Sequence, residues 1–257
     1  MSNLQLTKVS ENLQKLIKKL NTQIEPQLVP VETEPYSEYL QCFNNVTQKI
    51  KKDGGMIHYG WHIHYNKFLC EAEHHAVWEN EDGKLIDITP NEDAKKEIVF
   101  ISDNNSFTGK TKPNVRINLT NKIIIDDVIE ICDTIDKLQM YSTRIDKDTL
   151  VYDKSIYKIF NKYGELKNMF LPFAFSLGGN RDSRCYCGSG KKYLYCHRNI
   201  IKSHIKKDLI EAERIHQSLS DAHNYNEAIL NQYNKGGEKE QENIQKSLAI
   251  RDTQKYL

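Results

Sequence analysis

The chain has 257 residues, enough for more than one folded unit, and its 36 basic and 35 acidic residues leave a net charge of +1. A balance this close to neutral identifies no class of binding partner. The chain lacks a signal-peptide-like start and any apolar run of about 18 residues, so we expect a cytoplasmic protein without a membrane span. In that compartment its six cysteines should be reduced, as metal ligands, a nucleophile or buried apolar side chains.

Two helices are predicted ahead of a sheet. Apolar residues recur with a helical period over residues 3–22, and Pro26 and Pro30 end that pattern. Residues 36–52 could form a second helix, closed by a glycine pair. We therefore separate residues 1–34, an N-terminal helical extension, from the domain that follows.

The remaining sequence is predicted in four segments. Residues 56–102 alternate between apolar and polar side chains, which indicates an antiparallel sheet. Residues 35–115 are accordingly an α+β domain, in which a helix lies beside this small sheet. The following segments are a helical region, a cysteine-rich module and a charged helical tail, over residues 116–177, 178–200 and 201–257. The predicted fold class is α+β.

The stretch EAEHHAVWENEDGKLIDITP is predicted to be a β-hairpin that turns at its Glu-Asp-Gly sequence. If Asn80 faces Lys84, odd-numbered residues of one strand pair with odd-numbered residues of the other. His75 and Asp87 then lie on the same face of the sheet, one step from directly opposite. In that position the carboxylate would fix the tautomer of the imidazole, while His74 would point to the other face.

Cys42, in the second predicted helix, is the candidate nucleophile for this pair. If the helix begins near Gln41, its dipole would favour the thiolate. The order Cys, His, Asp is that of papain-like and transglutaminase-like thiol enzymes, and HAVWENEDGKLIDITP resembles the transglutaminase core. The resemblance implies Cys42 as nucleophile, His75 as base and Asp87 as orienting carboxylate, with Gln41 as an oxyanion donor.

Each of these residues also has a purely structural interpretation. Cys42 would be a small buried apolar side chain, His75 a satisfied core histidine, and Asp87 a cap for the turn after its strand. Cys70 and Cys132 carry no functional pattern and are predicted to lie in the core.

A rival constellation lies in the strand MIHYGWHIHYN. His62 and His64 share one face, and with Glu71 or Glu73 from the next strand they would make a metal site of two histidines and one carboxylate. The simpler interpretation is a polar outer face of the sheet over an aromatic inner face.

The segment NRDSRCYCGSGKKYLYCHR carries four soft ligands within thirteen residues: Cys185, Cys187, Cys196 and His197. Thiolate sulfur and imidazole nitrogen suit tetrahedral Zn²⁺, and a complete set of four protein ligands predicts a structural site. The segment resembles the SEC-C motif, a short zinc-binding module, at its ligand positions and its central Gly-Ser-Gly-Lys-Lys-Tyr turn. That resemblance covers about twenty residues and implies zinc binding and macromolecular docking, without a particular reaction.

The charge around this module agrees with docking. Residues 181–207 hold eight basic residues and one acidic residue, a local charge of +7, which could meet an acidic protein face, ribosome or nucleic acid. A solvated basic surface is the alternative. Two functions therefore stay open: a Cys-His-Asp hydrolase or acyltransferase for peptide or protein amides, docked by its zinc module, and a non-catalytic adaptor.

Overall fold

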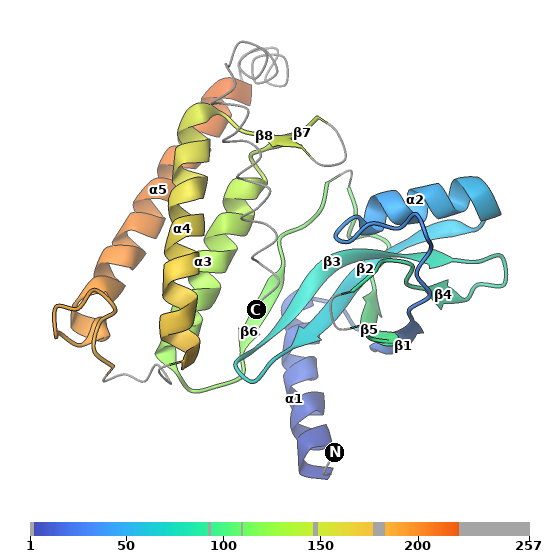
Figure 1. The fold of residues 1–257 in the computed structure, drawn as a ribbon, viewed down its shortest axis with the longest axis horizontal. Coiled ribbons are helices and arrows are strands. Elements are labelled where there is room, and N and C mark those ends of the chain that lie inside the picture. Colours follow the sequence, from blue (N-terminus) through green and yellow to red (C-terminus); the bar gives the residue numbers. More distant parts are fainter. Residues whose placement is uncertain (1–2, 92–93, 109, 146–148, 177–182, 221–257) are drawn as a thin grey trace. The chain divides into compact units, whose positions relative to one another are not determined.

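The computed structural model describes residues 3–91, 94–108, 110–145, 149–176 and 183–220. The chain divides into two compact units, Met1–Leu119 and Thr120–Leu257 (Figure 1). A sheet with two helices forms the first unit, and helices dominate the second, so the predicted α+β class is confirmed.

The first unit is built on one antiparallel sheet, which has six strands among the described residues, in the order β1-β5-β2-β3-β4 with β6 also on β3. The strands are β1 (Gln27–Pro30), β2 (Met56–Tyr65), β3 (Leu69–Glu79), β4 (Leu85–Ile86), β5 (Glu97–Ser102) and β6 (Val115–Asn118). β2 pairs with one edge of β3 along nearly its whole length. β4 and β6 pair with opposite ends of the other edge.

Two helices, α1 (Asn3–Leu20) and α2 (Cys42–Asp53), cover the same face of this sheet (Figure 1). Leu16 of α1 packs against Trp61 and Ala72, and Val46 of α2 packs against Ala76 on the same face. The alternation of β2 and β3 places these apolar side chains toward the helices, because directly opposed residues of an antiparallel pair share a face.

The opposite face of the sheet carries the histidines and is less exposed than expected. His62 and His75 are both buried, and Phe100 packs with Val29 and Val77 beside them. The simple alternation of a polar outer and an aromatic inner face therefore fails here, because apolar residues of β1, β3 and β5 form a second small core on the histidine face.

The second unit packs three helices against one another: α3 (Ile123–Gln139), α4 (Lys154–Ser176) and α5 (His197–Ser220). Each helix contributes buried apolar side chains at helical spacing, as Ile124, Val128, Ile131, Ile135 and Leu138 do on α3. A short hairpin, β7 (Thr143–Arg144) with β8 (Leu150–Val151), connects α3 to α4, and a 3₁₀ turn, Tyr193–Tyr195, precedes α5.

Several boundaries differ from the sequence-based segments. The predicted extension, residues 1–34, includes a strand of the sheet, because β1 pairs with β5. The first unit ends at Leu119, a few residues beyond the expected limit, because β6 pairs with β3. The predicted tail begins inside α5, and its residues 221–257 lie outside the described residues. Within the described part of the chain, every helix is too short or too polar to cross a membrane.

Candidate functional site

Cys42 is the first residue of α2, as the thiol-enzyme hypothesis requires. Leu40, two residues earlier, has a φ of 67°, a left-handed conformation that costs a residue other than glycine about 1–3 kcal/mol. Gln41 makes no side-chain capping bond to the helix. The N-terminal end of a helix dipole favours negative charge in the first turn, where Cys42 lies.

Asn45, one turn further along α2, holds the nucleophile segment in place. Its Oδ1 accepts the Glu38 N–H at 2.9 Å, and its Nδ2 donates to the Glu38 carbonyl at 2.8 Å and to Thr89 Oγ1 at 3.3 Å. The Thr89 N–H in turn donates to Asp87 Oδ1 at 2.9 Å. This buried chain of bonds joins the start of α2 to the Asp87 segment. Sequence reasoning missed Asn45; its only signal was an amide at an apolar position of the helix.

His75 and Asp87 lie together, as the hairpin register predicted. Trp78 pairs with Ile86 and Glu79 with Leu85, so residues of like parity are opposed. His75 Nε2 is 3.2 Å from Asp87 Oδ2, and the two side chains are 7% and 3% exposed. This is an ion-pair distance, although Nε2 has no well-aligned hydrogen bond within the described part of the chain. Such contacts commonly tighten only when substrate is bound.

Cys42 contacts the same imidazole. Burial alone would lower the pKa of His75, but its interactions with Asp87 and Cys42 outweigh burial and raise that pKa well above its usual value. The surroundings of His75 therefore favour its protonated form. A thiol, an imidazole and a carboxylate thus lie in sequence within one buried site.

The edge of β3 that faces away from β2 is only partly paired. β6 occupies this edge of β3 at Leu69–Ala72 and β4 occupies it at Trp78–Glu79. Between these two pairings, the described strands leave His75 and its neighbours without a partner on that side. α2 packs directly on β3, with Val46 against Ala76.

His74 points to the other face, as predicted, and serves a different role. Its Nε2 lies 2.8 Å from Ser106 Oγ, and its Nδ1 accepts the Lys112 N–H at 3.1 Å. Burial lowers its pKa to about 4. His74 therefore stays neutral and anchors the loop between β5 and β6, with no contact to Asp87.

The two histidines of the rival constellation lie beside this site. The rings of His62 and His64 are 3.9 Å apart, and His62 meets His75 edge-on at 5.3 Å between ring centroids. Burial lowers the pKa of His62 well below its usual value, and the charges of His64 and His75 add to this effect. Four ionisable or nucleophilic groups therefore neighbour one another here: Cys42, His62, His75 and Asp87.

In the second unit, the ligand atoms of Cys185, Cys187, Cys196 and His197 all lie within 4.8 Å of one another, close enough to bind a metal ion. His197 Nδ1 is 3.2 Å from Cys185 Sγ and 3.4 Å from Cys196 Sγ, and the sulfurs of Cys187 and Cys196 are 3.7 Å apart. Four ligands around a tetrahedral zinc are separated by roughly 3.3–3.8 Å. The donor atoms and their spacing fit that ion.

A tight loop brings the two ligand pairs together. Gly188 and Gly190 have φ values of 75° and 73°, a conformation that other residues rarely adopt. The Cys185 N–H donates to the Lys191 carbonyl at 2.8 Å, and Arg184 Nη1 donates to the Gly190 carbonyl at 2.9 Å. Hydrogen bonds from Ser189 lower the pKa of Cys187 to about 6, which favours a thiolate ligand.

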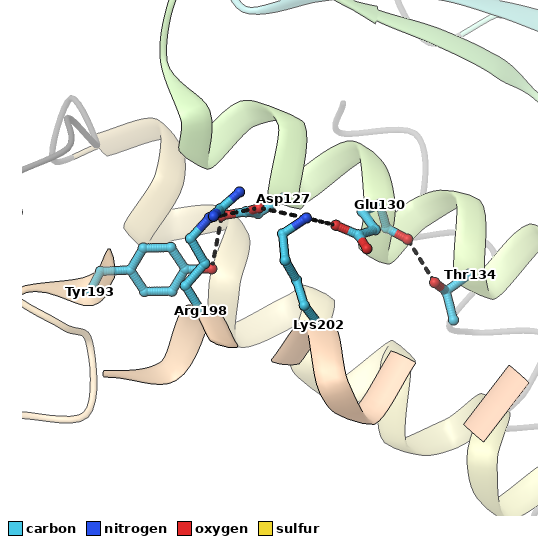
Figure 2. Close-up of polar contacts among 6 residues, drawn as sticks. All are labelled: Asp127, Glu130, Thr134, Tyr193, Arg198 and Lys202. Atoms are coloured by element: carbon cyan, nitrogen blue, oxygen red, sulfur yellow. Dashed lines mark hydrogen bonds and ion pairs between the residues drawn. The ribbon is translucent and has the colours of Figure 1, made fainter. Parts of the chain in front are cut away.

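Internal ion pairs neutralise part of the expected basic surface. Arg198 Nε donates to Asp127 Oδ2 at 2.8 Å, and Lys202 Nζ lies 2.5 Å from Glu130 Oε2 (Figure 2). Tyr193 also donates its hydroxyl proton to Asp127 Oδ2 at 3.2 Å. Two of the eight basic residues thus dock α5 on α3, so the local charge of +7 overstates what the surface offers.

No family model, curated protein or solved structure matches this chain. The resemblances to the SEC-C motif and to the transglutaminase core therefore remain expectations.

Proposed function

We propose that the first unit is a thiol enzyme in which Cys42 attacks the carbonyl carbon of an amide or ester. The observation that supports it is the position of one imidazole, His75, which contacts the thiol at a helix start and a carboxylate at 3.2 Å. This is the arrangement of a nucleophile, a base and an orienting group. A structural role alone accounts poorly for burying three ionisable side chains in contact.

The proposed reaction has two halves. The Cys42 thiolate adds to the carbonyl carbon, and as the tetrahedral oxyanion collapses the carbon–nitrogen bond breaks. The leaving amine takes the proton of the His75 imidazolium, which leaves an acyl thioester on Cys42. Water or a second amine then attacks the thioester and gives a proton to His75, and the sulfur departs as thiolate.

The oxyanion would form beside the start of α2. The Cys42 N–H is the nearest backbone donor there, and the Gln41 side chain, whose Oε1 accepts a hydrogen bond from Asn44 Nδ2 at 2.7 Å, is the proposed second donor. The preceding segment offers two further polar groups. Tyr36 Oη and Ser37 Oγ are buried without a hydrogen-bond partner among the described residues, so they can pair with a polar substrate.

Zinc is the metal that we propose for the second unit, held by the three thiolates of Cys185, Cys187 and Cys196 and by His197 Nδ1. With all four positions taken by protein, the ion would stabilise the loop and leave no position for substrate. Tyr186 packs edge-on against Phe170 and Phe173 of α4, at 5.8 and 5.5 Å between ring centroids. These aromatic contacts would fix the stapled loop to the helices.

A non-catalytic adaptor is the second candidate function. Tyr195 is 71% exposed and Ile200 is 47% exposed, and Lys191 and Lys192 are exposed nearby in the sequence. An exposed aromatic residue beside lysines suits an acidic protein face or a ribosomal or other nucleic-acid partner. The same surface would serve as the docking element of the enzyme.

Reactivity of Cys42 discriminates the two functions. Iodoacetamide labelling of the Cys42 peptide, followed by mass spectrometry from pH 5 to 9, should be strong well below the ~8.5 at which a free thiol ionises. His75→Ala should abolish labelling at the acidic end, and His74→Ala, which alters the neighbouring histidine on the other face, should preserve it. Cys70 and Cys132, 0% and 1% exposed, are internal controls for unfolding.

An acyl donor extends the test to catalysis. If Cys42 is the nucleophile, brief exposure of the protein to p-nitrophenyl acetate should leave an acetyl group on Cys42, and hydroxylamine should remove it. A Cys42 that is inert at every pH, or one whose labelling is indifferent to His75, would favour the adaptor instead.

A further inference from the structure

His62, His64 and Glu73 form a second cluster of metal-ligating side chains, on the first unit and separate from the cysteine-rich loop. One nitrogen or oxygen atom of each residue lies within 4.8 Å of the others. His64 Nε2 is 2.9 Å from Glu73 Oε2, and the two imidazole rings are 3.9 Å apart. Two imidazoles and one carboxylate are a ligand set for divalent transition metals.

The strand register builds this cluster. His62 lies directly opposite Glu73 in the pairing of β2 with β3, and His64 is two residues along on the same face. Two histidines at this spacing on one strand, with the carboxylate on its neighbour, converge without any loop. Because both strands belong to the centre of the sheet, the geometry is held rigidly.

Glu73, rather than Glu71, is the carboxylate of the set. Glu71 faces His64 across the strands, but its Oε1 is 2.7 Å from Arg116 Nη2 and accepts a hydrogen bond from Asn114 Nδ2 at 2.7 Å. Those contacts neutralise its charge within the buried edge of the sheet. Glu73 is half-buried and directed toward His64, so it can give an oxygen to a cation.

The three ligands differ in burial, one being buried and two partly exposed, which suits a metal site that an ion must reach from solvent. His62 is buried at 7% exposed, whereas the side chains of His64 and Glu73 are 32% and 30% exposed. An ion can therefore enter from the side of His64 and Glu73 and find a fixed inner ligand. Lys95 opposes the binding of a cation here, because its positive charge contributes to the lowered pKa of His62.

We propose that His62, His64 and Glu73 bind one divalent transition-metal ion, such as Zn²⁺, Co²⁺ or Ni²⁺, with water in the remaining positions. This ion would be bound in addition to the zinc ion proposed for the cysteine-rich loop. It stands independently of the thiol chemistry, because its ligands are side chains that the proposed reaction does not use.

The test is metal stoichiometry and spectroscopy on the full chain. Protein equilibrated with Co²⁺ should bind a second equivalent beyond the cysteine site. Thiolate ligation gives intense near-ultraviolet charge-transfer bands, whereas histidine and carboxylate ligation gives only weak visible bands, so the two sites are read separately. His58→Ala is the matched control, because His58 lies on the same face of β2 but bonds to Glu79 and Ser102.

Three variants decide the outcome. Glu73→Gln, which keeps the size and shape of the side chain, should weaken the second equivalent by at least the roughly 10–100-fold that loss of an outer-shell partner costs. His62→Ala with His64→Ala should remove it, and both changes should leave the thiolate bands intact. Lys95→Gln should tighten it. A single equivalent in the wild-type chain, or a second one that survives His62→Ala with His64→Ala, would overturn the proposal.

Discussion

Replacing Asp87 by asparagine tests the centre of the proposed thiol site with the smallest possible change. The side chain keeps its shape, and an amide oxygen can still accept the Thr89 N–H that Oδ1 now accepts at 2.9 Å. The main-chain bonds of Asp87 to Pro30 and Glu32 are untouched. What disappears is one negative charge, 3.2 Å from His75 Nε2.

The magnitude follows from that distance and from the burial of both groups. Coulomb's law at an effective dielectric constant of about 20 gives about 5 kcal/mol for two charges 3.2 Å apart, which is an upper limit. Measured effects of an opposite charge at this range are about 1–3 pKa units, or roughly 1.4–4 kcal/mol. Because Asp87 raises the pKa of His75, its removal lowers that pKa and destabilises the imidazolium.

The assay is the rate of iodoacetamide labelling of Cys42 at pH 6 and pH 9. At pH 6 the thiolate depends on its imidazolium partner, so Asp87→Asn should slow labelling by about 10- to 1000-fold. At pH 9 a thiol ionises without help, and the two proteins should converge. Asp103→Asn is the control, because Asp103 Oδ2 accepts a hydrogen bond from Trp61 Nε1 at 3.1 Å on the other face of the sheet.

Two results would refute the reasoning. If Asp87→Asn labels within about twofold of wild type at pH 6, Asp87 does not support the imidazolium, and the triad reduces to an incidental contact. If Asp103→Asn slows labelling as much as Asp87→Asn does, the loss reflects general loosening of the first unit rather than the missing charge.

Three further predictions concern stability. Cys185→Ser with Cys196→Ser should lower the melting temperature of the second unit in calorimetry and leave the transition of the first unit in place. Burial lowers the pKa of His74 to about 4, so its contribution to stability, complete above ~6.5, should be lost progressively as the pH falls from ~6.5 to about 4. His74→Ala should therefore show a smaller drop in urea midpoint between pH 7 and pH 5. Arg198→Ala should cost about 1–3 kcal/mol in urea unfolding of the second unit, because it deprives the buried Asp127 of one of its partners.

The hairpin register was accessible from sequence because it is local, whereas the predicted helix over residues 36–52 began six residues too early. A turn at an Asp-Gly pair fixes the parity of the residues on either side, so the relation between His75 and Asp87 followed from counting. A reactive Cys42 requires a helix that begins near Gln41, and α2 begins at Cys42. The ligand set of the cysteine-rich loop was equally local.

Non-local pairing explains what the sequence did not reveal. β1 and β6 are only four residues long each. The residues of β1 pair with residues at least 67 positions away, and those of β6 with residues more than forty positions away, so no pattern within either strand identifies it. The charges of Arg198 and Lys202 resemble free surface until α3 supplies Asp127 and Glu130. Counting charges along a segment cannot detect neutralisation by another helix.

The contact between Cys42 and His75 is also non-local, and the sequence did not predict it. Parity placed His75 on a face, but α2 packs on the opposite face, so periodicity alone would have separated the thiol from the imidazole. β4 pairs only with Trp78 and Glu79 and β6 only with Leu69–Ala72, so the middle of this edge of β3 has no partner among the described strands. The contact of the thiol with the imidazole therefore depends on how α2 packs against β3, which no motif in the sequence specifies.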